Sequence, residues 1–404
     1  MKSNWMTTTI NDVCSLVTDG AHNSPKSVEK GRYMASVKDF TEFGFDFSNC
    51  RRISEEDYER LRKQGCVPEK DDILVGKDGA RYFEDIVIYK QDEQPALLSS
   101  IAILRADRKK IIPEFLYYTL KTPAVKKNVR DNYGSGSAIP RIVLKDFKRM
   151  PFSFPSVDEQ RKITAICSAI DSKIQVNNAI NKNLEQQIEM VLLKTINDTD
   201  TQPVKLGDYL YIKGRIGWKG LKKSEYLPIS NYRIINGESL TLSGIDWNKA
   251  GYISAERYEE SPEIMLSIGD ILLSKDGTIG KIGYVDKLDA PTSVASGIFV
   301  IRNTRQSEIS TQFIYYLLKS KLFKAFIASR TEGSVIPHLY QKDFMEFEFQ
   351  LPSPDDMKIF DDTTADMFSL VFSNLNENER LIHLRDSLLP KLMSGELDVS
   401  DTDI

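Results

Sequence analysis

The sequence has few of the residue types that build metal centres and nucleophile–base pairs. Its 404 residues include only four cysteines and three histidines. None of the cysteines has the C-x-x-C spacing of a zinc site, and the histidines lie far apart; these residues are Cys14, Cys50, Cys66, Cys167, His22, His338 and His383. This scarcity argues against a metalloenzyme, a secreted disulfide framework and histidine-based catalysis.

Long apolar runs and phosphate-binding glycine motifs are also missing. No stretch approaches the roughly 18 apolar residues of a membrane span, and the first 20 residues do not have the pattern of a signal peptide. Gly280 and Lys281 are followed by Ile282, which breaks the phosphate-loop pattern, and no G-x-G-x-x-G occurs. We therefore expect a cytoplasmic protein that is not itself an enzyme and binds no metal or cofactor.

Charge is distributed unevenly along the chain, although the total is only -4. Residues 1–155 hold 26 Lys and Arg against 22 Asp and Glu, and residues 204–352 hold 19 against 17. Residues 353–404 hold 4 against 12, so most of the acidity lies at the C-terminal end. Two mildly basic blocks therefore remain, and each is compatible with a surface that faces phosphates.

The chain repeats itself at an offset of about 197 residues. DDILVGKDGA at 71–80 returns as GDILLSKDGT at 269–278, and FLYYTLKT at 115–122 returns as FIYYLLKS at 313–320. GSGSAIPRIVLKDF at 134–147 returns as TEGSVIPHLYQKDF at 331–344. Each copy predicts a strand that turns at Lys-Asp-Gly, a helix at F-x-Y-Y, and a final loop, which we call the closing loop.

A long helical pattern follows each copy. Apolar residues recur every three or four positions from Asp158 to Ile196, and again from Asp355 until Pro390, which is expected to end the helix. The two helices should pack antiparallel as a coiled coil, with Asp158 and Asp355 at their N-terminal ends. The predicted packing residues are Ile163, Ile166, Ile170, Asn177, Leu184, Ile188, Phe360, Met367, Asn374, Leu381 and Leu388; Ile180, Leu370 and Leu384 continue the same apolar series.

Asparagines interrupt both helical patterns at equivalent positions. Asn177 and Asn181 match Asn374 and Asn378 at the 197-residue offset. Polar residues within a helix interface fix its register, but these asparagines are equally compatible with a solvated face.

These patterns predict an α+β fold with two duplicated, mixed α/β lobes, pseudo-two-fold symmetric and separated by the two antiparallel helices. The predicted segments are a first lobe at 1–155, a spacer helix at 156–203, a second lobe at 204–352 and a C-terminal spacer helix at 353–404.

Basic residues near the predicted turns are the candidates for contact with nucleic acid. A lysine on a tight turn can present its ammonium group to a phosphate, although a solvated lysine on a structural turn fits the same pattern. The candidates are Lys26, Arg32, Lys38, Lys77 and Arg81 in the first lobe, and Lys219, Lys222, Lys223, Lys275 and Lys281 in the second.

Several of these segments resemble one family. TDGAHNSPKSVEKGRYMASVKDF at 18–40, DILLSKDGTIGK at 270–281 and GSVIPHLYQKDF at 333–344 are similar to parts of the target recognition domains of Type I restriction-modification DNA-specificity subunits. LPSPDD at 351–356 and LLPKLMSGELDVS at 388–400 are similar to the spacer regions of that family. The resemblance covers nearly the whole chain, in the same order.

The resemblance implies a non-catalytic subunit that binds double-stranded DNA. Each lobe would read one half of a bipartite, asymmetric site, and the helices would set the spacing and dock two methyltransferase subunits. Those partners would bind S-adenosylmethionine and methylate adenine, and motor-nuclease restriction subunits would use ATP and Mg. A different reading stays open from the residues alone, namely an assembly scaffold whose lobes bind protein; salt-dependent DNA affinity would separate the two.

Overall fold

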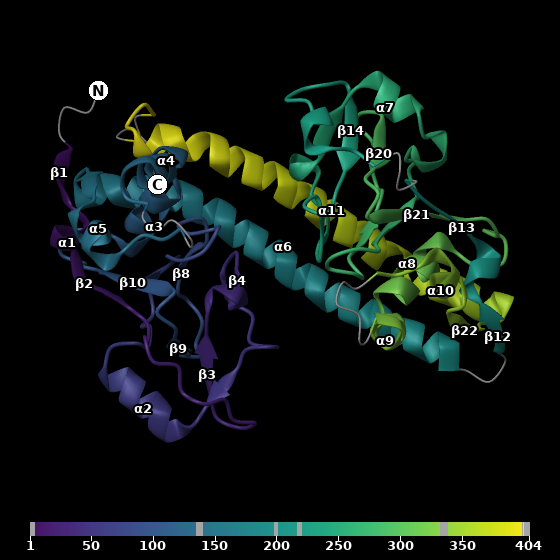
Figure 1. The fold of residues 1–404 in the computed structure, drawn as a ribbon, viewed down its shortest axis with the longest axis horizontal. Helices are drawn as coiled ribbons and strands as arrows, with labels where there is room; N and C mark the ends of the chain where they lie inside the picture. Colours follow the sequence, from purple (N-terminus) through teal and green to yellow (C-terminus); the bar gives the residue numbers. More distant parts are fainter. Residues whose placement is uncertain are drawn as a thin grey trace. The chain divides into compact units, whose positions relative to one another are not determined.

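The repeat in the sequence is also a repeat in the structure. The computed structural model describes residues 5–134, 140–197, 201–215, 220–331, 338–397 and 399. The chain divides into a first unit, Met1–Asn177 with Asn376–Ile404, and a second unit, Asn178–Leu375. Each unit contains one lobe and one part of each long helix (Figure 1).

Each lobe is built on a four-stranded antiparallel sheet. The first lobe has the order β2-β10-β7-β8, and the second has the equivalent order β13-β21-β18-β19. These strands are β2 (Cys14–Asp19), β10 (Ile101–Ala106), β7 (Ile73–Gly76), β8 (Ile86–Ile88), β13 (Leu210–Gly214), β21 (Ile298–Asn303), β18 (Ile271–Ser274) and β19 (Ile282–Tyr284). The predicted strands before the Lys-Asp-Gly turns are β7 and β18, whose residues are all buried.

A three-stranded mixed sheet accompanies each larger sheet. Its order is β6-β3-β9 in the first lobe and β17-β14-β20 in the second, and the last pair in each is parallel. These strands are β6 (Arg52–Ile53), β3 (Arg32–Ala35), β9 (Ala96–Leu97), β17 (Gly251–Ile253), β14 (Tyr232–Ile235) and β20 (Thr292–Val294).

Each lobe also contains two two-stranded antiparallel sheets. In each lobe one pair is a short hairpin, and the other joins the start of the lobe to its end. They are β4 (Phe40–Thr41) with β5 (Gly44–Phe45), β15 (Leu240–Thr241) with β16 (Gly244–Ile245), β1 (Met6–Thr9) with β11 (Pro151–Phe154), and β12 (Gln202–Lys205) with β22 (Glu348–Leu351).

The helices of the lobes also correspond. The F-x-Y-Y segments form α3 (Pro113–Lys121) and α8 (Thr311–Lys319), as predicted. The remaining α-helices of the lobes are α1 (Ile10–Val13), α2 (Glu55–Lys63), α4 (Pro123–Asn132), α5 (Leu144–Arg149), α7 (Ala255–Glu259), α9 (Lys321–Thr331) and α10 (Gln341–Met345). Short 3-10 helices are η1 (Val37–Asp39), η2 (Leu206–Tyr209), η4 (Lys223–Glu225), η5 (Trp247–Lys249) and η6 (Pro262–Ile264).

Two helices of similar length leave the lobes, namely α6 (Val157–Asn197) with 41 residues and α11 (Pro354–Met393) with 40. Their ends differ in detail from the prediction. The side chains that accept first-turn N–H groups belong to Ser156 and Ser353, and the predicted Asp158 and Asp355 lie within the first turns.

Pro390 was predicted to end the second helix, but α11 continues to Met393. The proline ring fixes a φ that a helix also adopts, and its missing N–H costs one bond. The carbonyl of Pro390 still accepts the N–H of Ser394 at 3.0 Å. The last turn therefore closes on the far side of the proline.

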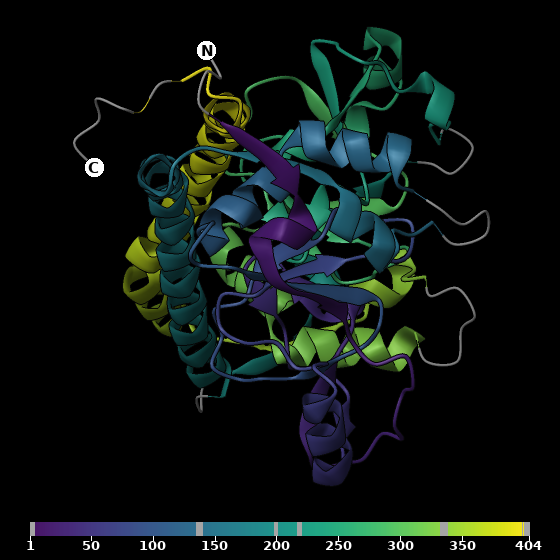
Figure 2. The ribbon, with the colours of Figure 1, turned by 90° about the vertical axis from the view of Figure 1, so that its left-hand side faces the viewer.

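The long helices run antiparallel, as predicted. In the first unit Asn177 donates to Asn378 at 2.9 Å, and Arg385 donates to Asp171 at 2.7 Å. In the second unit Asn374 donates to Asn181 at 2.8 Å. Residue numbers rise along α6 as they fall along α11, and the two helices lie side by side in both views (Figure 1 and Figure 2). The fold class is therefore the one expected from the repeat.

The four asparagines are buried between the helices and do not lie on a solvated face. They are no more than 7 % exposed, and Asn177 and Asn378 form the same pair, in repeat positions, as Asn374 and Asn181. Three residues of the predicted apolar series face outward instead, since Ile180, Leu370 and Leu384 are 39 %, 45 % and 48 % exposed. The polar residues thus occupy interface positions that an apolar pattern alone does not reveal.

The other predicted packing residues lie at or near the two largest cores. Ile163 and Ile170 are buried in the first unit, as are Ile188 and Phe360 in the second. Ile166, Leu388 and Met367 pack against these cores with partial burial, and Leu184 and Leu381 are half-buried. The helices in the described ranges include none with the length and hydropathy of a membrane span.

Candidate nucleic-acid interface

The two Lys-Asp-Gly turns, Lys77–Gly79 and Lys275–Gly277, meet the closing loops in the same way. In the first lobe the backbone of Asp78 bridges to Arg141, and the N–H of Ile142 donates to the carbonyl of Lys77 at 3.0 Å. In the second lobe Asp276 bridges to His338, and Leu339 donates to Lys275 at 3.0 Å. Segments about 60 residues apart in each lobe therefore form one structural element.

The turns need their glycines. Gly79 and Gly277 have φ values of 94° and 67°, in the left-handed region where a side chain is strained. The preceding lysines are tied to the sheet through their own N–H groups, since Lys77 donates to Ser100 at 2.8 Å and Lys275 donates to Gly297 at 2.9 Å. Each turn is thus held from both sides by backbone hydrogen bonds.

The loops after the turns close differently. In the first lobe Phe83 adopts a φ of 61°, donates its N–H to Gly76 at 2.6 Å and packs its buried ring against Phe147. In the second lobe the loop is two residues shorter, and Gly280, with a φ of 88°, donates to Ser274 at 3.1 Å. The later glycine of the second lobe therefore closes the loop where the first lobe uses a strained phenylalanine.

The two turn lysines have different surroundings. The side chain of Lys77 is 9 % exposed, and its Nζ lies 3.1 Å from Oδ2 of Asp19. Lys275 is half-buried, with its Nζ 5.0 Å from the centroid of the Phe299 ring. Within the described ranges no carboxylate pairs with Lys275. The Lys-Asp-Gly motif alone therefore does not predict whether the ammonium group of its lysine is available to a ligand.

Strand register explains this difference. Asp19 lies opposite Ala102 on β10, whereas the equivalent pair in the second lobe is Gly214 opposite Phe299 on β21. The second lobe thus has a glycine where the first has the aspartate that neutralises Lys77. Asp19 was not among the predicted site residues, although it lies in the TDGAHN segment at 18–23 that resembles the family.

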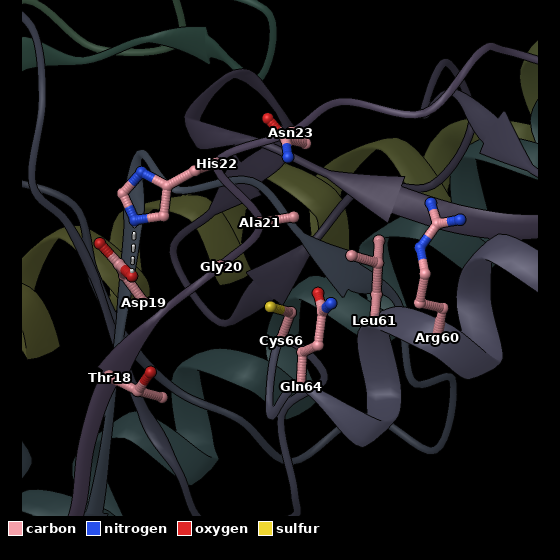
Figure 3. A pocket seen from close by; sticks show the side chains of 10 residues that line it. All are labelled: Thr18, Asp19, Gly20, Ala21, His22, Asn23, Arg60, Leu61, Gln64 and Cys66. Atoms are coloured by element: carbon pink, nitrogen blue, oxygen red, sulfur yellow. Dashed lines mark hydrogen bonds and ion pairs between the residues drawn. The ribbon is translucent and has the colours of Figure 1, made fainter.

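Asp19 also borders a cavity of about 400 Å³ between the end of β2 and α2 (Figure 3). Oδ1 of Asp19 lies 3.2 Å from Nε2 of His22, and the two side chains point toward one another in Figure 3. The lining residues are Thr18, Asp19, Gly20, Ala21, His22, Asn23, Arg60, Leu61, Gln64 and Cys66.

The second lobe has a buried arginine at the position equivalent to Gly20. Arg215 follows Gly214 as Gly20 follows Asp19, and it is only 1 % exposed. It donates to the carbonyl of Val294 at 3.2 Å, and burial lowers the pKa of its guanidinium. Arg215 therefore packs inside the second lobe and does not extend its basic surface.

A second cavity, of about 440 Å³, lies beside the first turn. It brings together Lys38 and Arg81, two of the predicted cations, and both side chains are exposed. Arg81 pairs with Asp85 at 2.7 Å, and this hydrogen bond raises the pKa of Arg81. Oδ1 of Asp78 is buried there without a hydrogen-bond partner in the part of the chain that the structure describes. The lining residues are Val37, Lys38, Phe40, Gly76, Asp78, Gly79, Ala80, Arg81 and Asp85.

The other predicted cations have different surroundings. Arg32 is half-buried, with its guanidinium 4.3 Å from the centroid of the Tyr58 ring. Lys281 donates to the carbonyl of Gly237 at 2.7 Å. Lys26, Lys222 and Lys223 are exposed, and Lys219 lies outside the described residues.

Comparison with known proteins shows the family of the two repeated segments. The family model described as "Type I restriction modification DNA specificity domain" matches residues 2–186 and again residues 199–382. The specificity subunit of the Type I restriction enzyme MjaVIII from Methanocaldococcus jannaschii is 22 % identical over 366 residues, covering 85 % of this chain and 83 % of that protein. That of HindI from Haemophilus influenzae is 21 % identical, covering 71 % and 78 %.

A solved structure shares the fold. The S subunit of a Type I restriction-modification system from M. genitalium superposes with a TM-score of 0.53 at 17 % identity, covering 97 % of both chains. The two matches of the family model coincide with the two copies of the repeat and cover most of the sequence. The chain therefore belongs to the Type I restriction-modification DNA specificity family and contains two copies of its domain.

Proposed function

We propose that this chain is the DNA-reading, non-catalytic subunit of a cytoplasmic Type I restriction-modification complex, and that each lobe recognises one half of a bipartite, asymmetric site. The observation that carries this proposal is the duplicated pairing of a Lys-Asp-Gly turn with a closing loop, within a chain of the DNA specificity family. Two similar elements with different side chains suit a target with two different halves. We take residues 1–155 and 204–352 as the two reading lobes.

The spacer segments, 156–203 and 353–404, would set the distance between the half-sites and dock two methyltransferase subunits. Support comes from large apolar side chains that α6 and α11 leave exposed, namely Val176, Ile180, Met190, Ile359, Leu370 and Leu384. Apolar side chains that stay this exposed among the described residues of the two helices suit a protein partner. In this proposal the partners bind S-adenosylmethionine and methylate adenine, and restriction subunits use ATP and Mg.

Methylation sequencing tests the proposal directly. Cells that express this chain with its methyltransferase should carry methyladenine at a two-part motif, and cells that lack the gene should lose those marks. Purified complex should also bind duplex containing the motif with an affinity that falls steeply with salt, because Lys and Arg side chains displace counterions from phosphates. Marks that persist without the gene, or lobes with no duplex affinity, would instead favour a protein-binding scaffold.

A further inference from the structure

The Lys-Asp-Gly turn has the same backbone hydrogen bonds in both lobes. The side chain that already has a partner within the protein, however, differs between them. In the first lobe Lys77 is not available to a ligand, because its ammonium group pairs with Asp19 at 3.1 Å and both side chains are less than 10 % exposed. The neighbouring Asp78 stays 29 % exposed at the edge of the 440 Å³ cavity. The group that this turn offers to a ligand is therefore a carboxylate, a pure hydrogen-bond acceptor.

Asp78 has acceptor capacity that the protein does not use. Its Oδ1 is buried and has no hydrogen-bond partner within the described ranges, and its Oδ2 lies 3.9 Å from Nζ of Lys77, beyond hydrogen-bond distance. A buried acceptor without a donor is unfavourable, and a ligand reaches this carboxylate through the part of the side chain that stays exposed. Lys38, which lines the same cavity, supplies positive charge that lets a carboxylate approach DNA, whereas the charge of Arg81 is matched by Asp85.

The second turn has the opposite arrangement. Here one carboxylate oxygen of the aspartate, Oδ1 of Asp276, already contacts Nδ1 of His338, and the side chain is 45 % exposed. Position 214, which is equivalent to Asp19, is a glycine. It therefore supplies no carboxylate to pair with Lys275 as Asp19 pairs with Lys77. Lys275 is half-buried, its ammonium group lies 5.0 Å from the centroid of the Phe299 ring, and that group offers donors only.

We infer that the two turns read DNA with opposite hydrogen-bonding polarity. Asp78 accepts from the exocyclic amino group of a cytosine or adenine in the half-site of the first lobe. Lys275 donates to an acceptor in the half-site of the second lobe, either the N7 and O6 edge of a guanine or a phosphate oxygen. This inference rests on the proposed function and assigns one residue to each half of the motif.

The test uses the full chain with its methyltransferase and compares Asp78→Asn, Lys275→Gln and wild type by methylation sequencing. Asp78→Asn removes one acceptor and adds donors, so discrimination at one base pair of the first half should fall about tenfold while the second half stays unchanged. Lys275→Gln should relax one position of the second half if it reads guanine. If it contacts phosphate, affinity should fall uniformly and the salt slope should decrease by about 1.

Matched controls separate reading from general charge effects. Asp92→Asn and Lys249→Gln remove exposed charges, with side chains 98 % and 60 % exposed, that line neither turn. Both should leave the motif and the salt slope unchanged. If Asp78→Asn does not fold, which the midpoint of thermal unfolding will show, Asp78→Ser replaces it.

The outcomes distinguish this inference from the proposed function. Folded Asp78 and Lys275 variants that mark the wild-type motif at the wild-type rate, with the wild-type salt slope, overturn the inference and leave the proposed function intact. A wild-type chain that directs no two-part marks overturns the proposed function itself.

Discussion

Single residues show most clearly that the two copies have diverged. Tyr118 and Tyr316 are equivalent in the repeat, and both are buried. Tyr118 donates its hydroxyl to Asp171 at 2.7 Å. The position equivalent to Asp171 is Phe368, whose ring centroid lies 6.0 Å from that of Tyr316. The hydroxyl of Tyr316 consequently has no partner among the described residues.

We predict opposite effects when each of these tyrosines is replaced by phenylalanine. Tyr118→Phe should lower the free energy of unfolding by about 1.5–3 kcal/mol, because it removes a hydrogen bond to a carboxylate. Tyr316→Phe should be neutral or stabilising by up to about 1 kcal/mol, because it removes a buried hydroxyl that gains nothing. Urea unfolding of the two variants checks this. Equal destabilisation by both would show that Tyr316 has a partner, such as a bound water.

At this scale the sequence predicts turn positions better than side-chain availability. The Lys-Asp-Gly motifs correctly mark two equivalent turns after buried strands. Whether Lys77 or Lys275 is available depends on the residue that strand pairing brings beside it, Asp19 or Gly214. Those residues lie about 60 positions away along the chain, and strand register is a tertiary property.

At the scale of elements, the interface between the long helices contains polar residues that a hydrophobic pattern cannot identify. Asp171 and Arg385 are 5 % and 6 % exposed and form an ion pair in the first unit, and both of the equivalent positions, Phe368 and Ile188, are apolar. Burial lowers the pKa of Arg385, but its hydrogen bonds to Asp171 and Asp386, together with the charges of those carboxylates, outweigh burial and raise the pKa overall. Apolar spacing therefore locates the helices but not the full interface.

The contact of Glu377 with α6 predicts that the stability of the folded chain depends on pH in the acid range. Asn177 donates to Oε2 of Glu377 at 2.7 Å and Lys173 lies 3.1 Å from the same oxygen, and both lower the pKa of the carboxyl. A pKa that is lower in the folded state adds stability above the unfolded value, roughly pH 4.3, and that stability is lost as pH falls through the folded value. The unfolding midpoint should therefore drop more steeply below about pH 4.3 in wild type than in Glu377→Gln.

Thermal unfolding between pH 6 and pH 3, chosen to span the roughly 4.3 pKa of a free glutamate, measures this difference. Glu56→Gln is the control, because Glu56 is an exposed residue of α2 in the same unit. Identical pH profiles for wild type and Glu377→Gln would show that the contact with Asn177 does not depend on the charge.

At the scale of the whole molecule, the order of the repeated motifs was enough to predict two lobes and two long helices. The two compact units, however, do not separate the lobes from the long helices. The boundaries fall after Asn177 in α6 and after Leu375 in α11, so each unit contains a part of both helices. The reason is packing, since helix residues such as Ile163 and Ile188 belong to the cores of their lobes.

This division has a consequence for exchanging lobes. Replacing residues 1–155 with those of a relative that reads another sequence should change one half of the methylated motif, because the first turn and its closing loop are exchanged while those of the second lobe stay. The junction also separates Tyr118 from Asp171 and the backbone N–H of Ile112 from its partner Gln160. A relative without a matching tyrosine should therefore give a chimera that unfolds at a lower temperature, even where its motif changes as expected.

Methylation sequencing together with thermal unfolding separates these two effects. Restoring a tyrosine at position 118 of the chimera should recover stability without changing the motif, because its hydroxyl donates to Asp171 in the helix interface and Asp171 keeps its ion pair with Arg385. A chimera in which both halves of the motif change would contradict the assignment of one half-site to each lobe.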